Sequence, residues 1–150
     1  MIKINVLSRN KKWNKYINSP HSYFNSQAKR LSRASFINRG NFQFTLLLSE
    51  SNEVKYLNKT FRKKNKTTDV LSFPFYHVKE LKKLLKKNES IYLGDIVINF
   101  NKIEKKNEVI FRKHLDQLWI HGLLHLFGYT HKKNVEYNKM RKLEQFLLNL

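Results

Sequence analysis

The sequence contains no cysteine, and it has only four glycines and two prolines among its 150 residues. The absence of cysteine excludes disulfide bonds, thiolate catalysis and every zinc site with sulfur ligands. The scarcity of glycine argues against a Gly-rich phosphate-binding loop. Apolar runs are short: residues 44–48, interrupted by Thr45, fall far short of the roughly 18–20 residues that span a bilayer. The N-terminus lacks the apolar stretch of a secretory signal, so we expect a cytoplasmic protein without membrane attachment.

Acidic residues are also scarce, since 11 Asp and Glu stand against 30 Lys and Arg, for a net charge of +19. The excess is spread along the chain: +8 in residues 1–50, +6 in 51–100 and +5 in 101–150. A charge of this size favours a polyanionic partner, with nucleic acid the first candidate. The alternative source of part of the lysine content is the codon usage of an AT-rich genome.

The length and the 41% apolar content are typical of one domain with a substantial core. Four segments alternate apolar and polar residues as strands do: residues 2–6, 42–48, 70–75 and 91–100. Pro74 indicates an edge or an end of the third strand. Five segments have helical patterns: residues 22–37, 51–61, 78–87, 108–127 and 134–148. Ser51 is suited to cap the second of these helices. The sequence therefore predicts an α+β fold with a small four-stranded sheet.

Four of the six histidines lie between residues 114 and 131. His121 and His125 are separated by one helical turn and project from the same face. Gly128 is suited to end the helix in a left-handed turn, after which His131 can reach the same point. Three neutral imidazoles with one open position form a catalytic type of metal site. We expect one zinc ion, although nickel, copper or iron would also accept these ligands.

Histidines in such a segment can also be ordinary core or surface residues. We expect this of His114, which we place away from the helix face that carries His121 and His125. The spacing of the other three is that of the metzincin proteases, which have a glutamate base directly after the first histidine. This chain has Gly122 there. Because glycine cannot take a proton, the pattern argues against peptide hydrolysis.

The segment HGLLHLFGYTH, residues 121–131, resembles the signature of the YbeY endoribonucleases. Two more blocks resemble this family in the same order, YLNKTFRKKNKTTDVLSFPF at 56–75 and LGDIVI at 93–98. The similarity covers about residues 42–148. It implies a single-domain, zincin-like α+β fold, with a small mixed sheet and a metal-binding helix near the C-terminus.

The resemblance also implies a metal-dependent, single-strand-specific endoribonuclease that matures the 3′ end of small-subunit ribosomal RNA and takes part in ribosome quality control. His121, His125 and His131 would be its zinc ligands, and Arg62 would match a functionally important arginine near the metal. The implied partners are ribosomal RNA, the small ribosomal subunit and the GTPase Era.

Arg62 offers a planar fork that binds phosphate through two hydrogen bonds and stabilises developing charge. Beside it, Lys63, Lys64 and Lys66 form either an RNA-binding ridge or an ordinary solvated loop. A zinc ion at the triad would lower the pKa of a water, or it would polarise a phosphoryl oxygen for attack by the RNA 2′-hydroxyl. The residues do not choose between these routes.

Thr130 departs from the family signature, which has aspartate before the last histidine. Two alternatives to an active ribonuclease stay open, and the uncharged threonine favours the first of them. One is a weak or inactive zinc-containing factor that binds ribosomes or RNA during assembly. The other is a zincin-type metallopeptidase, which the missing glutamate at position 122 disfavours.

Overall fold

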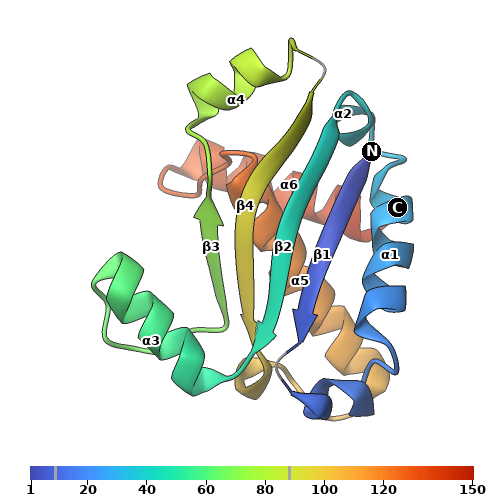
Figure 1. Ribbon diagram of the computed structural model, residues 1–150, viewed down its shortest axis with the longest axis vertical. Helices are drawn as coiled ribbons and strands as arrows, with labels where there is room; N and C mark the ends of the chain where they lie inside the picture. Colours follow the sequence, from blue (N-terminus) through green and yellow to red (C-terminus); the bar gives the residue numbers. More distant parts are fainter. Residues whose placement is uncertain (9, 88) are drawn as a thin grey trace.

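The computed structural model describes residues 1–8, 10–87 and 89–150 (Figure 1). In these residues β1 (Ile2–Ser8), β2 (Asn41–Ser49), β3 (Val70–Pro74) and β4 (Ser90–Asn99) form one sheet in the order β1-β2-β4-β3. β1, β2 and β4 run parallel, and β3 is antiparallel to β4. The mixed four-stranded sheet is therefore confirmed. Pro74 ends the edge strand, where its missing N–H does not interrupt the sheet.

The helices connect the strands. Their bounds are α1 (Pro20–Leu31), α2 (Ser35–Asn38), α3 (Ser51–Arg62), α4 (Val78–Leu84), α5 (Glu108–Leu126) and α6 (Asn134–Leu148), with 3-10 turns η1 (Lys11–Lys15) and η2 (Phe100–Lys102). α1, α5 and α6 cover one face of the sheet, and α3 packs on the other. α5 and α6 lie behind the sheet and α1 lies along β1 (Figure 1). Among the described residues, no helix combines the length and apolar character needed to cross a bilayer.

Two predicted helical features differ from the structure. The helix expected over residues 22–37 starts at Pro20 and ends at Leu31, because an extended backbone at Ala34 redirects the chain into α2 and buries Ile37. Ser51 is the first residue of α3 and not its cap. Its hydroxyl instead accepts a hydrogen bond from the side-chain amide of Asn99 at 3.0 Å.

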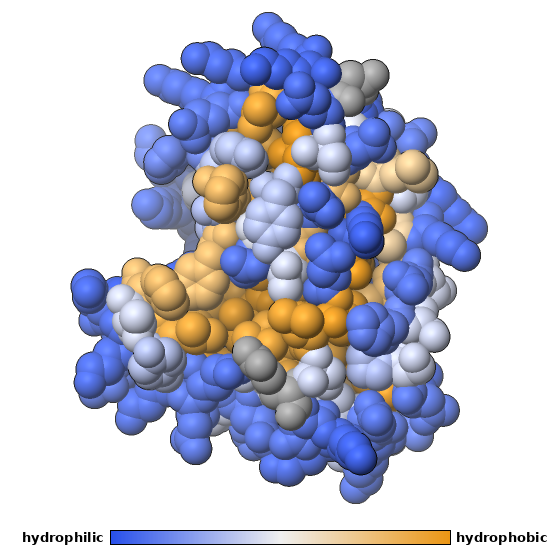
Figure 2. All heavy atoms as spheres, in the orientation of Figure 1, coloured by the Kyte–Doolittle hydropathy of each residue, from blue (hydrophilic) through white to orange (hydrophobic). Residues whose placement is uncertain are grey.

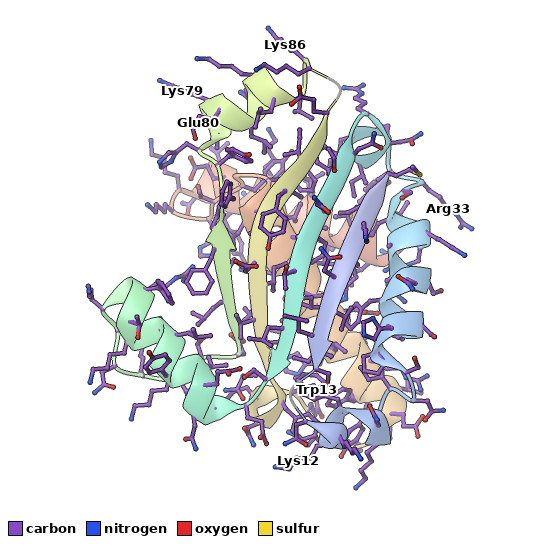
Figure 3. All side chains as sticks on the ribbon, viewed as in Figure 1. Lys12, Trp13, Arg33, Lys79, Glu80 and Lys86 are labelled. Carbon is purple, nitrogen blue, oxygen red and sulfur yellow. The ribbon has the colours of Figure 1, made fainter. Side chains whose placement is uncertain are left out.

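The core contains an element that the sequence patterns did not predict. The turn η1 carries Trp13, which is fully buried and packs edge-on against Phe100 and Phe111 with ring centroids 5.1 and 5.9 Å apart. In Figure 3, Trp13 points inward, whereas Lys12 beside it lies at the surface, where its ammonium contacts Oε1 of Glu50 at 2.7 Å. Lys86 and Arg33 project outward at other sides of the chain (Figure 3), so the basic charge surrounds the core.

The opposite face of the sheet is only partly covered. Figure 2 shows apolar atoms gathered there between α3 and α4. This face has a groove of about 330 Å³, whose lining includes Leu7, Leu47, Phe73 and Val97 of the strands and Phe61 of α3. The helices that complete the core therefore lie on the side of the sheet that also carries the histidines.

Gly122 lets α5 lie unusually close to the sheet. A Cβ atom at this position would lie 2.9 Å from Cγ2 of Ile96 on β4 and 3.0 Å from Oγ of Ser72 on β3. These distances are shorter than normal van der Waals contacts. The missing side chain thus sets how far β3 and β4 stand from the helix.

We predict that Gly122→Ala destabilises the fold, although alanine is the better helix former. Overpacking costs about 1–3 kcal/mol, and it outweighs the gain of about 1 kcal/mol in helix propensity. Urea unfolding followed by circular dichroism measures the difference. Asn138→Ala at an exposed position of α6 is the control and should be slightly stabilising. A Gly122→Ala variant as stable as the parent chain would contradict this account of the α5 packing.

Candidate metal centre

The three histidines of the predicted triad meet at the C-terminal end of α5. His121 and His125 lie one turn apart in the helix, and His131 lies in the loop that follows. One ligand nitrogen from each ring can be chosen so that all three lie within 4.8 Å of one another. His121 and His125 are half-buried, and His131 is exposed. The three form a group that can hold a metal ion.

The helix ends in a Schellman cap that brings His131 to the other two histidines. The N–H of Gly128 donates to the carbonyl of His125 at 2.9 Å, and the N–H of Tyr129 donates to the carbonyl of Leu124 at 3.0 Å, which is the pattern of this motif. Gly128 has a φ of +89°, so the predicted left-handed turn is confirmed. Because an L side chain strains this conformation, glycine suits the sharp reversal before His131.

Two hydrogen bonds orient the rings of His121 and His125. Nδ1 of His121 lies 2.5 Å from Oε1 of Glu144 on α6, and Nδ1 of His125 lies 2.8 Å from the carbonyl oxygen of Tyr129. A carboxylate and a carbonyl only accept hydrogen bonds, so both Nδ1 atoms donate. In the neutral rings the lone pairs are therefore on the two Nε2 atoms.

These two Nε2 atoms face each other at 3.0 Å. Two lone pairs at this distance repel unless a proton or a cation lies between them. Burial is the main cause that lowers the pKa of His125 to about 4; the hydrogen bond to Tyr129 opposes it, and the nearby charges of His121, His131 and Arg62 add to the lowering. A proton on His125 is therefore disfavoured at neutral pH, and a metal cation suits the arrangement better.

The nitrogen spacing also suits a metal. Tetrahedral zinc binds histidine nitrogen at about 2.0–2.1 Å, which places two such nitrogens about 3.3 Å apart. The observed 3.0 Å between the Nε2 atoms of His121 and His125 is close to this value. The donor set, three imidazoles and no sulfur, fits a catalytic type of site.

A cleft of about 640 Å³ opens beside the triad. It lies between the loop after α5, the edge strand β3 and the end of α3. Its lining combines all three histidines with basic and hydroxyl side chains: Arg62, Lys64, Thr68, Ser72, Tyr76, Thr130 and Lys132. Of the basic residues singled out from the sequence, Arg62 and Lys64 face this cleft. Lys63 and Lys66 are exposed outside its lining.

Arg62 is held at the cleft by contacts to the edge strand. Its guanidinium donates to the carbonyl of Ser72 and lies 5.5 Å from the ring centroid of Phe73. The loop after Arg62 is fixed from inside the fold, because the buried Asn58 donates from its side-chain amide to the carbonyl of Lys66 at 2.8 Å. A guanidinium group has five N–H donors, so Arg62 can bind a phosphate while one of its N–H groups donates to Ser72.

Thr130, the position that departs from the family signature, has a carboxylate beside it. Its hydroxyl donates to Oε2 of Glu136 on α6 at 2.6 Å. This hydrogen bond, followed by the nearby Lys133 and Lys132, holds the pKa of Glu136 below its usual value. The loop that carries His131 is thus tied to α6 by a charged group.

Glu144 and Glu136 were not singled out from the sequence; the docking of α6 brings Glu144 to His121 and Glu136 to Thr130. His114 is not part of the group that can hold a metal, as predicted, but its position on the helix relative to His121 was wrong. Seven residues are almost two full turns of a helix, so His114 lies on the same side of α5 as His121. Both line one cavity.

A family model described as "Endoribonuclease YbeY" matches residues 7–150. The chain belongs to the YbeY endoribonuclease family. A YbeY endoribonuclease from Pelagibacter ubique is 40% identical, with 98% of this chain and 94% of that protein covered. One from Thermodesulfovibrio yellowstonii is 33% identical, with 84% and 77% covered. The family match includes residues 7–40, where the sequence motifs gave no specific match.

A solution structure of a Thermotoga maritima protein has the same fold as this YbeY chain. The TM-score is 0.55 at 24% identity, and the match covers 99% of this chain and 90% of the other. The predicted α+β class therefore agrees with both the sheet topology and a solved structure.

We predict that Glu144→Gln lowers zinc affinity about 10- to 100-fold, the usual effect of removing a carboxylate that orients a ligating histidine. The amide preserves the shape but loses the charge that holds the Nδ1 proton of His121. Competition with a chromogenic chelator measures the affinity. Glu108→Gln, exposed at the start of α5, is the matched control. Equal zinc affinity of the Glu144→Gln and parent chains would contradict the orienting role.

Proposed function

We propose that this chain is a zinc-dependent endoribonuclease that cleaves single-stranded RNA during the maturation of ribosomal RNA. Membership of the YbeY family supports the reaction class. The observation that carries the proposal is the placement of Arg62 and the histidine triad in one basic cleft. A phosphodiester entering this cleft meets a cation site and a phosphate-binding side chain together.

His121, His125 and His131 hold the ion in this proposal. Zinc suits three neutral imidazoles without sulfur. A bound zinc ion supplies Lewis acidity beside the scissile phosphate. The protein keeps the ligand nitrogens free for it through the hydrogen bonds from the Nδ1 atoms to Glu144 and Tyr129.

Arg62 binds the phosphate and stabilises the negative charge that grows on its oxygens during cleavage. Its anchoring on the carbonyl of Ser72 and the ring of Phe73 fixes the guanidinium before substrate arrives, which is the condition for efficient electrostatic stabilisation. Lys64 and Lys132, which line the same cleft, attract the RNA backbone. Lys63 and Lys66, exposed next to the cleft, extend this basic surface along the strand.

Neither alternative gains support from the site. A peptidase base at position 122 would have to fit where even an added Cβ atom would lie only 2.9 Å from Ile96. The idea of an inactive assembly factor rests on Thr130, yet that residue is joined to Glu136 and the triad and Arg62 are in place. We propose that Glu136 supplies the local negative charge that the family aspartate supplies elsewhere.

The family resemblance extends the proposal to the cellular setting. We propose that residues 1–150 act as one domain in the cytoplasm on the 3′ end of small-subunit ribosomal RNA and in ribosome quality control. The small ribosomal subunit and the GTPase Era are the proposed partners.

We predict that the zinc-loaded chain cleaves single-stranded RNA and that the double variant His121→Ala, His125→Ala does not. Arg62→Ala should lower kcat about 100-fold, the typical loss when one charge-stabilising donor is removed. Its zinc content should not change. Cleavage of a labelled oligoribonucleotide, measured with and without a chelator, gives these rates.

Arg39→Ala, at an exposed arginine outside the cleft, serves as the control for the loss of one positive charge. Equal cleavage by the parent chain and by the double histidine variant would show that a contaminating nuclease cuts the RNA, and it would contradict the proposal.

We predict a steep salt dependence of RNA binding. Each phosphate contact to single-stranded RNA contributes about 0.7 to the slope of log affinity against log salt. Replacing Lys63, Lys64 and Lys66 by Gln should therefore reduce the slope by about 2. Replacing Lys11, Lys15 and Lys29, which lie on η1 and α1, removes the same charge and should change the slope little. An affinity that salt does not change would mean that the lysines do not bind RNA.

A further inference from the structure

A second cavity adjoins the metal centre on the side of His121 that faces α6. It has a volume of about 450 Å³ and lies between α5, α6 and the start of β3. Asp69, Val70 and His121 line both this cavity and the basic cleft. A ligand in the cavity is therefore next to the triad, and a chain lying in the cleft can place one of its groups there.

The lining suits a flat group with polar edges. Val70, Leu118 and Leu148 are apolar, whereas Gln117 and Gln145 carry amides that both donate and accept hydrogen bonds. Apolar contacts to the faces and amide contacts to the edges are how proteins bind unstacked RNA bases. The volume is also within the range of about 300–1,000 Å³ for small-molecule pockets.

His114 adds a further donor. Its Nδ1 accepts a hydrogen bond from the N–H of Glu104 at 3.1 Å, so the neutral ring carries its proton on Nε2. This N–H is suited to the carbonyl oxygens and ring nitrogens of a base.

The charges of the lining separate the base from the phosphate. Asp69 and Glu144 place two carboxylates at the cavity, with Arg141 as its cation. The cleft has Arg62, Lys64 and Lys132 instead, with Asp69 as its carboxylate. A phosphate is repelled by the carboxylates and is attracted to the cleft. A neutral base experiences no such repulsion.

We propose that this cavity binds one nucleobase of the RNA substrate while the adjoining phosphates lie in the basic cleft. The inference rests on the proposed ribonuclease function, since it places the substrate at the same metal centre. It makes Gln117, Gln145 and His114 residues that select and position the RNA. One base anchored beside the triad fixes which phosphate reaches Arg62.

The first test uses ligands that an endonuclease cannot cut. The zinc-loaded, isotope-labelled chain is titrated with AMP, CMP, GMP and UMP, and with ribose 5-phosphate as the ligand without a base. Ribose 5-phosphate should shift amide resonances of the cleft, such as those of Lys64 and Thr130. At least one nucleotide should in addition shift Gln117 and Gln145. Identical shifts for the nucleotides and ribose 5-phosphate would overturn the proposal.

The second test fills the cavity. Gln117→Trp, at an exposed helical position, should weaken the binding of a single-stranded 12-nucleotide RNA about tenfold, a typical effect of losing one base contact. Fluorescence anisotropy in the presence of a chelator measures binding without cleavage. Val109→Trp, also exposed on α5, is the matched control and should bind like the parent chain.

A Gln117→Trp chain that is folded by circular dichroism and binds RNA like the parent would also overturn the cavity assignment. Because neither test measures cleavage, the two proposals fail separately. Base-specific shifts in a chain that does not cut RNA would overturn the ribonuclease function alone.

Discussion

The close contact between α5 and the strands β3 and β4 positions the groups of the metal centre. Gly122 allows this contact because it has no side chain to press on Ile96 and Ser72. The side chain of His121, one residue before it, lines the cleft. On the neighbouring strand β3, the carbonyl of Ser72 accepts a hydrogen bond from Arg62. A wider separation of helix and sheet would move the arginine away from the triad. Gly122 thus has two effects: it stands where a metzincin protease has its glutamate base, and it allows the close packing that brings Arg62 near the triad.

The parts of the site that depend on local geometry could be predicted from the sequence. The spacing of His121 and His125 follows from one helical turn, and Gly128 follows from the need for a left-handed cap. Arg62 could be named only through the family resemblance, because nothing local shows that it is held against β3. Glu144 could not be found, since its contact with His121 spans 23 residues and depends on how α6 docks. The side of α5 on which His114 lies could have been predicted, because seven residues are almost two full turns of a helix.

The fold shows the same division. Strands with strict alternation were placed well, because one buried face imposes a period of two. The helix expected over 22–37 was wrong in extent, because burial of Ile37 requires a bend that a continuous helical pattern hides. Trp13 lies in a short 3-10 turn that has no periodicity to detect. Such elements are fixed by the space left in the core.

The attachment of α6 has a consequence for the order in which the site is built. Arg30 of α1 donates to the carbonyls of Leu147 and Leu148 at 2.8 and 3.3 Å, and Glu144 of the same helix contacts His121. Arg30, in the N-terminal part of the chain, thus helps to hold α6, the helix that orients His121 on α5. On a ribosome making this protein, the triad emerges before the carboxylate that orients it. The nascent chain therefore completes its metal centre only after α6 has been synthesised and has packed against α1.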